Sequence, residues 1–393
     1  VNKTSIPAAY QLAVRRQDLF TLPLSCATTN DLVPYLEIAN RVLTAKLAVE
    51  SKQADIAWYL ATTTYPFEAP FNPHRMQVDL TLQALDLSLV MLYGTTTDFP
   101  AADPHALALA VLALSLEQAA FVRTLLATEP ALKTAWGLRA KDPLASLSQL
   151  AVFSRHSGLP RAAVAELTRQ GLTAEELAAG LAHGLWFNRS LPAGQSVQIQ
   201  LGDTSPDTLT NLTSATLDAL NRYVRLARWS GLGFTDLGYA LGSLGLDLLD
   251  DASLASLAMA RAVVQGLEWS WAQASALWAS MPTTGAGGAV GTPSLFDQVW
   301  NNPVVLGADG RVYHPRDPGN PLYTDDVATW DIEAGLTTNA GFDVARLRAG
   351  LGVTSDDLQT LAGLAFPDDT EVLLTVANLS SLYRLGALAR AMD

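Results

Sequence analysis

The sequence predicts an all-α protein made of stacked helical hairpins, and two local signals carry this prediction. Apolar residues recur at steps of three and four positions over much of the chain, which places them on one face of a helix. Between such segments a glycine, a large apolar residue and a capping hydroxyl or acid follow one another, a pattern typical of a joint between two helices.

Helical spacing recurs along most of the chain. In the first such segment, Val33, Leu36, Leu43 and Leu47 fall on one stripe. The predicted helices cover residues 33–49, 78–93, 105–128, 143–155, 217–229, 254–265 and 372–392. The most apolar stretch, residues 106–116, is shorter than the roughly 18 to 20 residues needed to cross a bilayer, so we expect a buried core helix there.

Glycines mark the predicted joints between helices. Glycine accepts the left-handed backbone that closes a helix, and the leucine that follows it packs back on the helix that has ended. The joints lie at Gly158, Gly171, Gly231, Gly266 and Gly350. Capping-box spacing occurs for Ser270 with Gln273 and for Thr173 with Glu176. Because the intervals between the joints share no period, a regular solenoid is not expected.

Three stretches break the helical pattern. Residues 194–201 alternate between apolar and polar side chains and predict one short strand, which needs a partner. Residues 283–293 are glycine-rich and predict a loop, and Asp309-Gly310 within 303–323 predicts a small hairpin insertion. We therefore expect an N-terminal helical region at 1–155, a helical-hairpin region at 156–282, a loop with a small hairpin at 283–325, and a C-terminal helical region at 326–393.

The composition describes a chain that folds by burying apolar surface and carries excess negative charge. Of its 393 residues, 49% are hydrophobic and 16% are charged, and the net charge is −13. Phosphate backbones and anionic membranes attract basic proteins, so we expect protein partners and neither nucleic acid nor membrane insertion. The chain begins with Val1 and no signal peptide is visible, which favours a segment of a longer protein.

No motif of a catalytic or metal site is present. None of the histidines lies in an HExxH arrangement, and they are far apart in the sequence: His74, His105, His156, His183 and His314. Cys26, the single cysteine, cannot form an internal disulfide and is expected to be a packed thiol. A linker, not a nucleotide-binding loop, is expected at Gly285, Gly287, Gly288 and Gly291, which follow no strand. We therefore expect no catalysis, no cofactor and no metal.

Adjacent aspartates allow two interpretations. Paired carboxylates serve acid–base catalysis or calcium binding, but each pair here precedes an apolar run expected to be helical, where acids stabilise the free amides and the helix dipole. No EF-hand loop accompanies them. Helix capping is therefore expected at Asp250-Asp251, Asp325-Asp326, Asp356-Asp357 and Asp368-Asp369.

Tryptophans cluster in the second half of the chain and are expected to pack in the core, although an aromatic cluster can also line a sugar-binding groove. Trp271 and Trp278 are seven positions apart and share a helix face. The whole cluster comprises Trp229, Trp269, Trp271, Trp278 and Trp300.

Arginines form a second periodic feature. Arg222, Arg225 and Arg228 lie at three-residue steps beside an apolar helix face. For this stripe, a solvated or inter-helix salt-bridging face is favoured over a phosphate site.

Five segments spread over nearly the whole chain carry motifs of one family. They read RRQDLFTLPLSCATTNDLVPYLEIANRVL at 15–43, YPFEAPF at 65–71, TLDALNRYVRLARWSGLGFTDLGYAL at 216–241, SLFDQVWN at 294–301 and LYRLGALAR at 382–390. In order and pattern they resemble the A component of bacterial Tc (toxin complex) insecticidal toxins, which includes virulence plasmid A protein-like sequences. The matching part of the A component is its α-helical shell.

The resemblance implies a structural role without catalysis. In this family five shells surround a central channel in a homopentamer, which is secreted by a bacterium and opens on a pH shift. The regions that bind the host receptor, form the pore and dock the B and C components have no counterpart here. Two alternatives remain open: a free-standing or split-chain helical virulence protein that lacks the pore, and a glycan-binding module that uses the tryptophan cluster.

Overall fold

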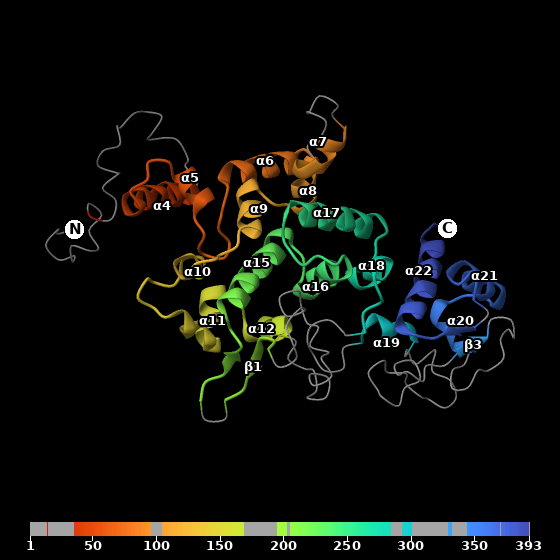
Figure 1. The fold of residues 1–393 in the computed structure, drawn as a ribbon. Helices are drawn as coiled ribbons and strands as arrows, with labels where there is room; N and C mark the ends of the chain where they lie inside the picture. The colour runs from red at the N-terminus through yellow and green to blue at the C-terminus, as the bar shows by residue number, and fades with distance from the viewer. Residues whose placement is uncertain are drawn as a thin grey trace. The chain divides into compact units, whose positions relative to one another are not determined.

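The computed structural model confirms a mostly helical protein with two small strand pairs (Figure 1). It describes residues 14, 35–95, 104–168, 195–202, 205–283, 293–300, 329–331, 344–369 and 371–392. The chain divides into two compact units, residues 1–59 and residues 60–393. The four regions expected from the sequence stay a prediction.

The described part of the first unit contains α4 (Tyr35–Ser51), which confirms the helix predicted at 33–49. No residue of α4 is buried. The Glu37 carboxylate forms an ion pair with the Arg41 guanidinium one turn later, an arrangement that stabilises an exposed helix. The next helix, α5 (Ile56–Thr62), begins at a turn where the Asp55 carboxylate accepts a hydrogen bond from the Trp58 amide.

The second unit contains the other described helices and all four described strands. The helices of its N-terminal half are α6 (Pro73–Ala84), α7 (Leu89–Thr95), α8 (Pro104–Leu112), α9 (Leu116–Arg123), α10 (Glu129–Ala135), the 3₁₀ helix η3 (Leu144–Ser148), α11 (Leu150–Ser157) and α12 (Arg161–Thr168). The later helices are α15 (Ser214–Ser230), α16 (Phe234–Ser243), α17 (Asp251–Gly266), α18 (Trp271–Trp278), α19 (Leu295–Trp300), α20 (Val344–Leu351), α21 (Ser355–Ala365) and α22 (Val376–Met392).

The helices predicted at 217–229 and 254–265 are confirmed as α15 and α17, whereas other predicted helices are interrupted. The segment 78–93 is divided between α6 and α7 at Asp86, and 105–128 is divided between α8 and α9 at Ala113; both residues have positive φ. A capping box at Ser115 starts α9, so local capping overrides an apolar pattern that continues through the break. The segment 143–155 begins as a 3₁₀ helix, and 372–392 begins with a strand.

The glycine joints are confirmed at Gly158 and Gly231, which end α11 and α15 in the left-handed conformation. Joints between helices are also confirmed next to Gly266 and Gly350, where α17 and α20 end. The left-handed conformation expected at these two glycines is wrong, because the residues with positive φ follow two positions later, at Glu268 and Gly352. The capping box of Ser270 with Gln273 is confirmed. Gly171, Thr173 and Glu176 lie outside the described residues.

The strand predicted at 194–201 is confirmed as β1 (Gln198–Gln200), and its partner is β2 (Thr208–Thr210). The two are antiparallel, with Ile199 opposite Leu209, and both of these side chains are buried. A second antiparallel pair, β3 (Thr329–Asp331) with β4 (Glu371–Leu373), was not predicted. The predicted linker at Gly285, Gly287, Gly288 and Gly291 and the hairpin at Asp309-Gly310 lie outside the described residues.

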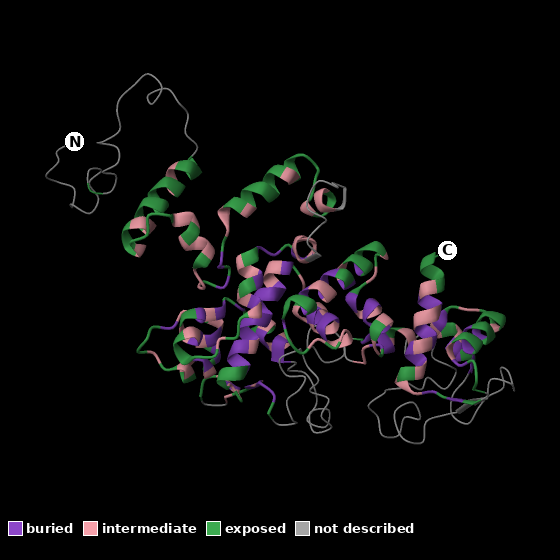
Figure 2. Cartoon of the chain, turned by 45° about the horizontal axis from the view of Figure 1, so that its top comes forward, coloured by how far each residue is buried: buried purple, intermediate pink, exposed green. Residues whose placement is uncertain are grey.

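Buried apolar side chains form two clusters in the second unit. One contains residues from Phe67 to Ala274 and the other contains residues from Ala276 to Ala387. The stretch 106–116 contributes buried residues to the first cluster, as expected for a core segment. In Figure 2, α15 is largely buried whereas α6 is largely exposed. No single described helix is long and apolar enough to span a membrane; α8 and α9 pass that test only as a pair bent by 95°.

Candidate functional site

The histidines do not form a site in the part of the chain that the structure describes. His105 lies 3.3 Å from the Asp251 carboxylate, and the His156 ring donates a 2.8 Å hydrogen bond from Nδ1 to the Trp136 carbonyl oxygen. Among the described residues, no group of three histidine, cysteine, aspartate or glutamate side chains could hold a metal ion. Cys26, His183 and His314 lie outside the described residues.

Two of the three acidic pairs that the structure describes lie at helix starts, as predicted. The Asp250 carboxylate accepts a 2.8 Å hydrogen bond from the Ser253 amide at the start of α17, and this bond holds the pKa of Asp250 below its usual value. The pair Asp356-Asp357 lies in the first turn of α21, where Asp357 completes a capping box. The expectation for Asp368-Asp369 is wrong, because strand β4 follows them. Asp325-Asp326 lies outside the described residues.

Core packing is confirmed for Trp271 and Trp300, which are buried. The Trp300 indole donates to the Met281 sulfur at 3.3 Å. Trp229 and Trp269 are half-buried against the core. The expectation that Trp278 is a second buried anchor is wrong, because 37% of this residue is exposed. The tryptophans therefore do not present one aromatic surface.

The arginine stripe on α15 is the most unusual polar feature of the described fold. A capping box of Thr213 with Thr216 starts this helix, and most of its residues from Thr216 to Ser230 are buried. Arg222 is 6% exposed and Arg225 is 0% exposed. The interpretation of a solvated face is therefore wrong. The helix is surrounded by other elements, and its polar side chains must find partners inside the protein.

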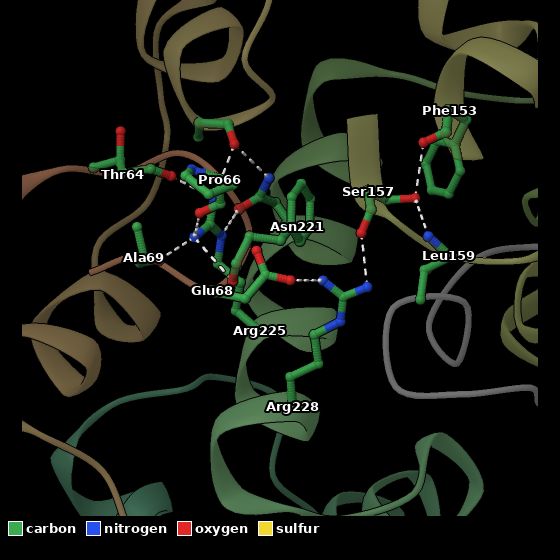
Figure 3. A network of polar contacts seen from close by, with 12 residues as sticks. Thr64, Pro66, Glu68, Ala69, Phe153, Ser157, Leu159, Asn221, Arg225 and Arg228 are labelled. Carbon is green, nitrogen blue, oxygen red and sulfur yellow. Dashed lines mark hydrogen bonds and ion pairs between the residues drawn. The ribbon is translucent and has the colours of Figure 1, made fainter. Parts of the chain in front are cut away.

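Arg225 is held in a cage of backbone carbonyl oxygens, which we call the arginine cage. Its guanidinium donates to the carbonyl oxygen of Ala135 at 2.9 Å, and its Nε donates to the Asn221 amide oxygen at 2.8 Å. The other acceptors are the carbonyl oxygens of Thr64, Pro66, Phe67 and Ala69. All four belong to residues 64–71, the YPFEAPF segment and the residue before it, which we call the strap. Figure 3 shows the strap around the guanidinium.

Aromatic rings and carbonyl dipoles replace a counter-ion in the arginine cage. The guanidinium carbon of Arg225 lies 4.5 Å from the ring centres of Phe67 and Phe121 and 5.7 Å from that of Trp229. Among the described residues, no carboxylate forms an ion pair with it. Burial lowers the pKa of Arg225 to about 9, a shift that the charge of Glu68 partly opposes. At this pKa the group is charged at neutral pH.

The two neighbouring arginines of α15 tie down other segments. Arg222 pairs with Asp218 at 2.6 Å, and Asp218 also accepts a 2.8 Å hydrogen bond from the Leu126 amide. Arg228 donates to the Ser157 carbonyl oxygen at 2.7 Å and lies 3.5 Å from the Glu68 carboxylate (Figure 3). Arg228 forms a salt bridge as predicted, but its partner lies in the strap, so an inter-helix salt bridge is not confirmed. Arg225 and Arg228 therefore both fix the strap to α15, and Arg222 fixes α9 to it through the Val122 carbonyl oxygen at 3.3 Å.

Sequence reasoning missed the arginine cage because its acceptors are backbone atoms. Any residue supplies a carbonyl oxygen, so no residue type in the strap marks it as the partner of Arg225. The three-residue spacing also gives Arg225 no feature that distinguishes it from Arg222 or Arg228. The one usable signal was that YPFEAPF and the α15 segment both belong to the family-like motifs, and the structure places these two motifs in contact.

The comparisons with known proteins agree with this resemblance. Residues 2–146 match the family described as Salmonella virulence plasmid 28.1kDa A protein (VRP1). The fold is similar to that of Morganella morganii TcdA4, determined by cryo-EM, with a TM-score of 0.61 and 16% sequence identity. No curated protein sequence matches this chain.

The match to TcdA4 covers 98% of this chain and 21% of the TcdA4 chain. The chain therefore spans about a fifth of the length of that protein. TcdA4 is an A component of a Tc toxin, so the predicted resemblance to this family is confirmed. At 16% identity the similarity concerns the fold.

Proposed function

We propose that this chain is a structural segment of the α-helical shell of a Tc-type toxin A component and has no catalytic activity of its own. The observation that carries this proposal is the fold similarity to TcdA4, which extends over 98% of the chain. A structural similarity limited to one helical hairpin would be common among helical proteins. A match over 98% of the chain supports a shared architectural role.

The polar chemistry of the described residues supports a structural role. Buried and half-buried arginines bind backbone carbonyl oxygens: Arg225 binds the strap, Arg346 binds Trp300 at 2.8 Å, and the half-buried Arg384 binds Ala276 at 2.7 Å. Catalytic sites instead direct charged groups toward a cleft where a substrate can reach them. Guanidinium groups that already bind backbone carbonyl oxygens hold chain segments together, which suits a structural shell.

The finer parts of the proposal come from the resemblance to the A component. By this resemblance, five copies of the protein that contains the chain form a pentamer whose shells surround a channel. Receptor binding and docking of the B and C components belong to other parts of that longer protein. The protein acts outside the bacterium that secretes it.

A free-standing helical virulence protein is the second candidate, and the family match over residues 2–146 favours it. The alternative of a glycan-binding module has less support, because Trp271 and Trp300 are buried in the core. The two remaining candidates differ in assembly size, since a free chain has a mass of 41.8 kDa.

Mass photometry and electron microscopy of the native gene product test the proposal. We expect an assembly many times heavier than 41.8 kDa with five-fold symmetry. We also expect the helices of this chain in the outer wall of the reconstruction. A native product that remains a 41.8 kDa monomer would overturn the proposal in favour of the free-standing protein. A five-fold particle in which this chain lines the channel would overturn the shell assignment.

A further inference from the structure

A polar pocket lies between the segment that follows α10 and the helix α11. Its volume is about 510 Å³, and its charged lining residues are Arg139, Asp142, Arg155 and His156. This volume lies in the range of small-molecule sites, roughly 300 to 1,000 Å³. The pocket therefore has room for a small organic anion and is larger than a single-ion site requires.

The arginines of this pocket differ from nearly all the others. Each described arginine donates to a carboxylate or a carbonyl oxygen inside the protein, except Arg139, Arg155 and Arg348. Two of these three lie in the same pocket. The net charge of the chain is −13, so carboxylates are in excess and are available to pair with arginines. Arg139 and Arg155 are exposed, so an anion from outside can reach both guanidinium groups.

The remaining polar groups of the pocket are already oriented. The Asp142 carboxylate accepts a 3.2 Å hydrogen bond from the Arg139 backbone amide, which fixes the loop that carries Arg139. The Trp136 carbonyl oxygen can only accept, so the His156 Nδ1 bonded to it carries the proton. The other ring nitrogen, Nε2, has no hydrogen-bond partner among the described residues. Among the described lining residues, Asp142 is the single acid, against two guanidinium groups.

We propose that this pocket binds a small oxyanion, a carboxylate or phosphate group, with Arg139 and Arg155 as its main ligands. A guanidinium group presents two parallel N–H donors that match the paired oxygens of these groups. The proposal is independent of the shell role, because it depends only on the pocket and its unpaired charges. Nothing in it requires the chain to be part of a larger assembly.

Isothermal titration calorimetry of the full chain with inorganic phosphate and, separately, with citrate tests the proposal. We expect binding of at least one anion at low ionic strength. Arg139→Gln and Arg155→Gln each weaken it about tenfold or more, the loss expected for a charge-assisted hydrogen bond. Arg41→Gln is the matched control, because it removes the same charge from the exposed face of α4. It is expected to change the affinity less than twofold.

The outcomes separate clearly. Binding of phosphate alone or citrate alone identifies which oxyanion the pocket takes, and both results support the proposal. Absence of measurable binding of either anion at about 10 mM would overturn it. An equal loss in Arg41→Gln would also overturn it, because general charge attraction would then account for the binding. Circular dichroism checks the fold of each variant, and neither pocket arginine side chain has a hydrogen bond or ion pair to lose among the described residues.

Discussion

Replacing Arg225 with methionine tests whether the arginine cage holds the strap in place. Two of the caged oxygens keep another donor, since Pro66 accepts from the Ala69 amide and Ala135 accepts from the Asn221 side chain. The carbonyl oxygens of Thr64, Phe67 and Ala69 and the side-chain amide oxygen of Asn221 lose theirs. An unsatisfied buried acceptor costs about 1 to 3 kcal/mol, so four of them cost roughly 4 to 12 kcal/mol.

Two effects reduce that sum. The strap can relax toward water, and the variant no longer buries a charge that the protein must desolvate. We therefore expect the free energy of unfolding of Arg225→Met to fall by about 4 kcal/mol, within the range for breaking a buried charge network. Arg225→Lys keeps the charge but lacks the planar fork, and we expect about half of this loss. A loss of about 4 kcal/mol is a large share of the 5 to 15 kcal/mol typical of a folded protein.

Urea unfolding followed by tryptophan fluorescence and circular dichroism measures these changes. The control is Arg155→Met, which makes the same substitution at an exposed arginine that has no hydrogen-bond or ion-pair partner in the described part of the chain, and it should change the stability by less than about 0.5 kcal/mol. Limited proteolysis with mass spectrometry reports on the strap itself, and new cleavage within residues 60–72 is expected in Arg225→Met. A loss below about 1 kcal/mol, with an uncleaved strap, would refute the view that the cage is a main structural contact.

Three further predictions concern single side chains. A Cβ at Gly350 would lie 2.6 Å from the Trp300 ring, so Gly350→Ala should lower the stability by about 1 to 3 kcal/mol. Gly363 has open space around it, so Gly363→Ala should raise the stability by about 0.5 to 1 kcal/mol. Thermal melts in which Gly350→Ala is the more stable of the two variants would contradict this packing. Burial, together with the charge of Glu166, raises the pKa of Asp236, so the native state binds more protons and stability falls as pH rises through the interval above the usual pKa. Asp236→Asn should therefore be more stable than the parent at pH 7, by less than about 1 kcal/mol, and the difference in stability should shrink toward pH 3. Urea unfolding at several pH values measures this difference, and a difference that does not change with pH would contradict the raised pKa. Asp250→Ala removes the N-cap of α17 and should cost about 1 kcal/mol, whereas Asp250→Asn should retain most of it; equal melts for the two variants would exclude a capping role.

Two of the helices that were correctly predicted from the sequence, α15 and α17, begin at residues whose side chains cap them. The helix α15 begins at a capping box and ends at Gly231, and the predicted segment 217–229 lies within it. The helix predicted at 105–128 continued through Ala113 because the apolar pattern does not change there. Periodicity identifies which residues face the core, but a turn can occur without interrupting that pattern.

The sequence alone determined the all-α class, most capping sites and the family resemblance, because each of these depends on residues near one another along the chain. The tertiary structure alone decided that Arg225 is enclosed by the strap, that Gly350 lies against Trp300, and that Arg139 and Arg155 share a pocket. These features join segments that are distant in sequence, and in the arginine cage the partner atoms belong to the backbone. Carbonyl oxygens carry no residue signature, so only the folded chain shows which of them surround a buried charge.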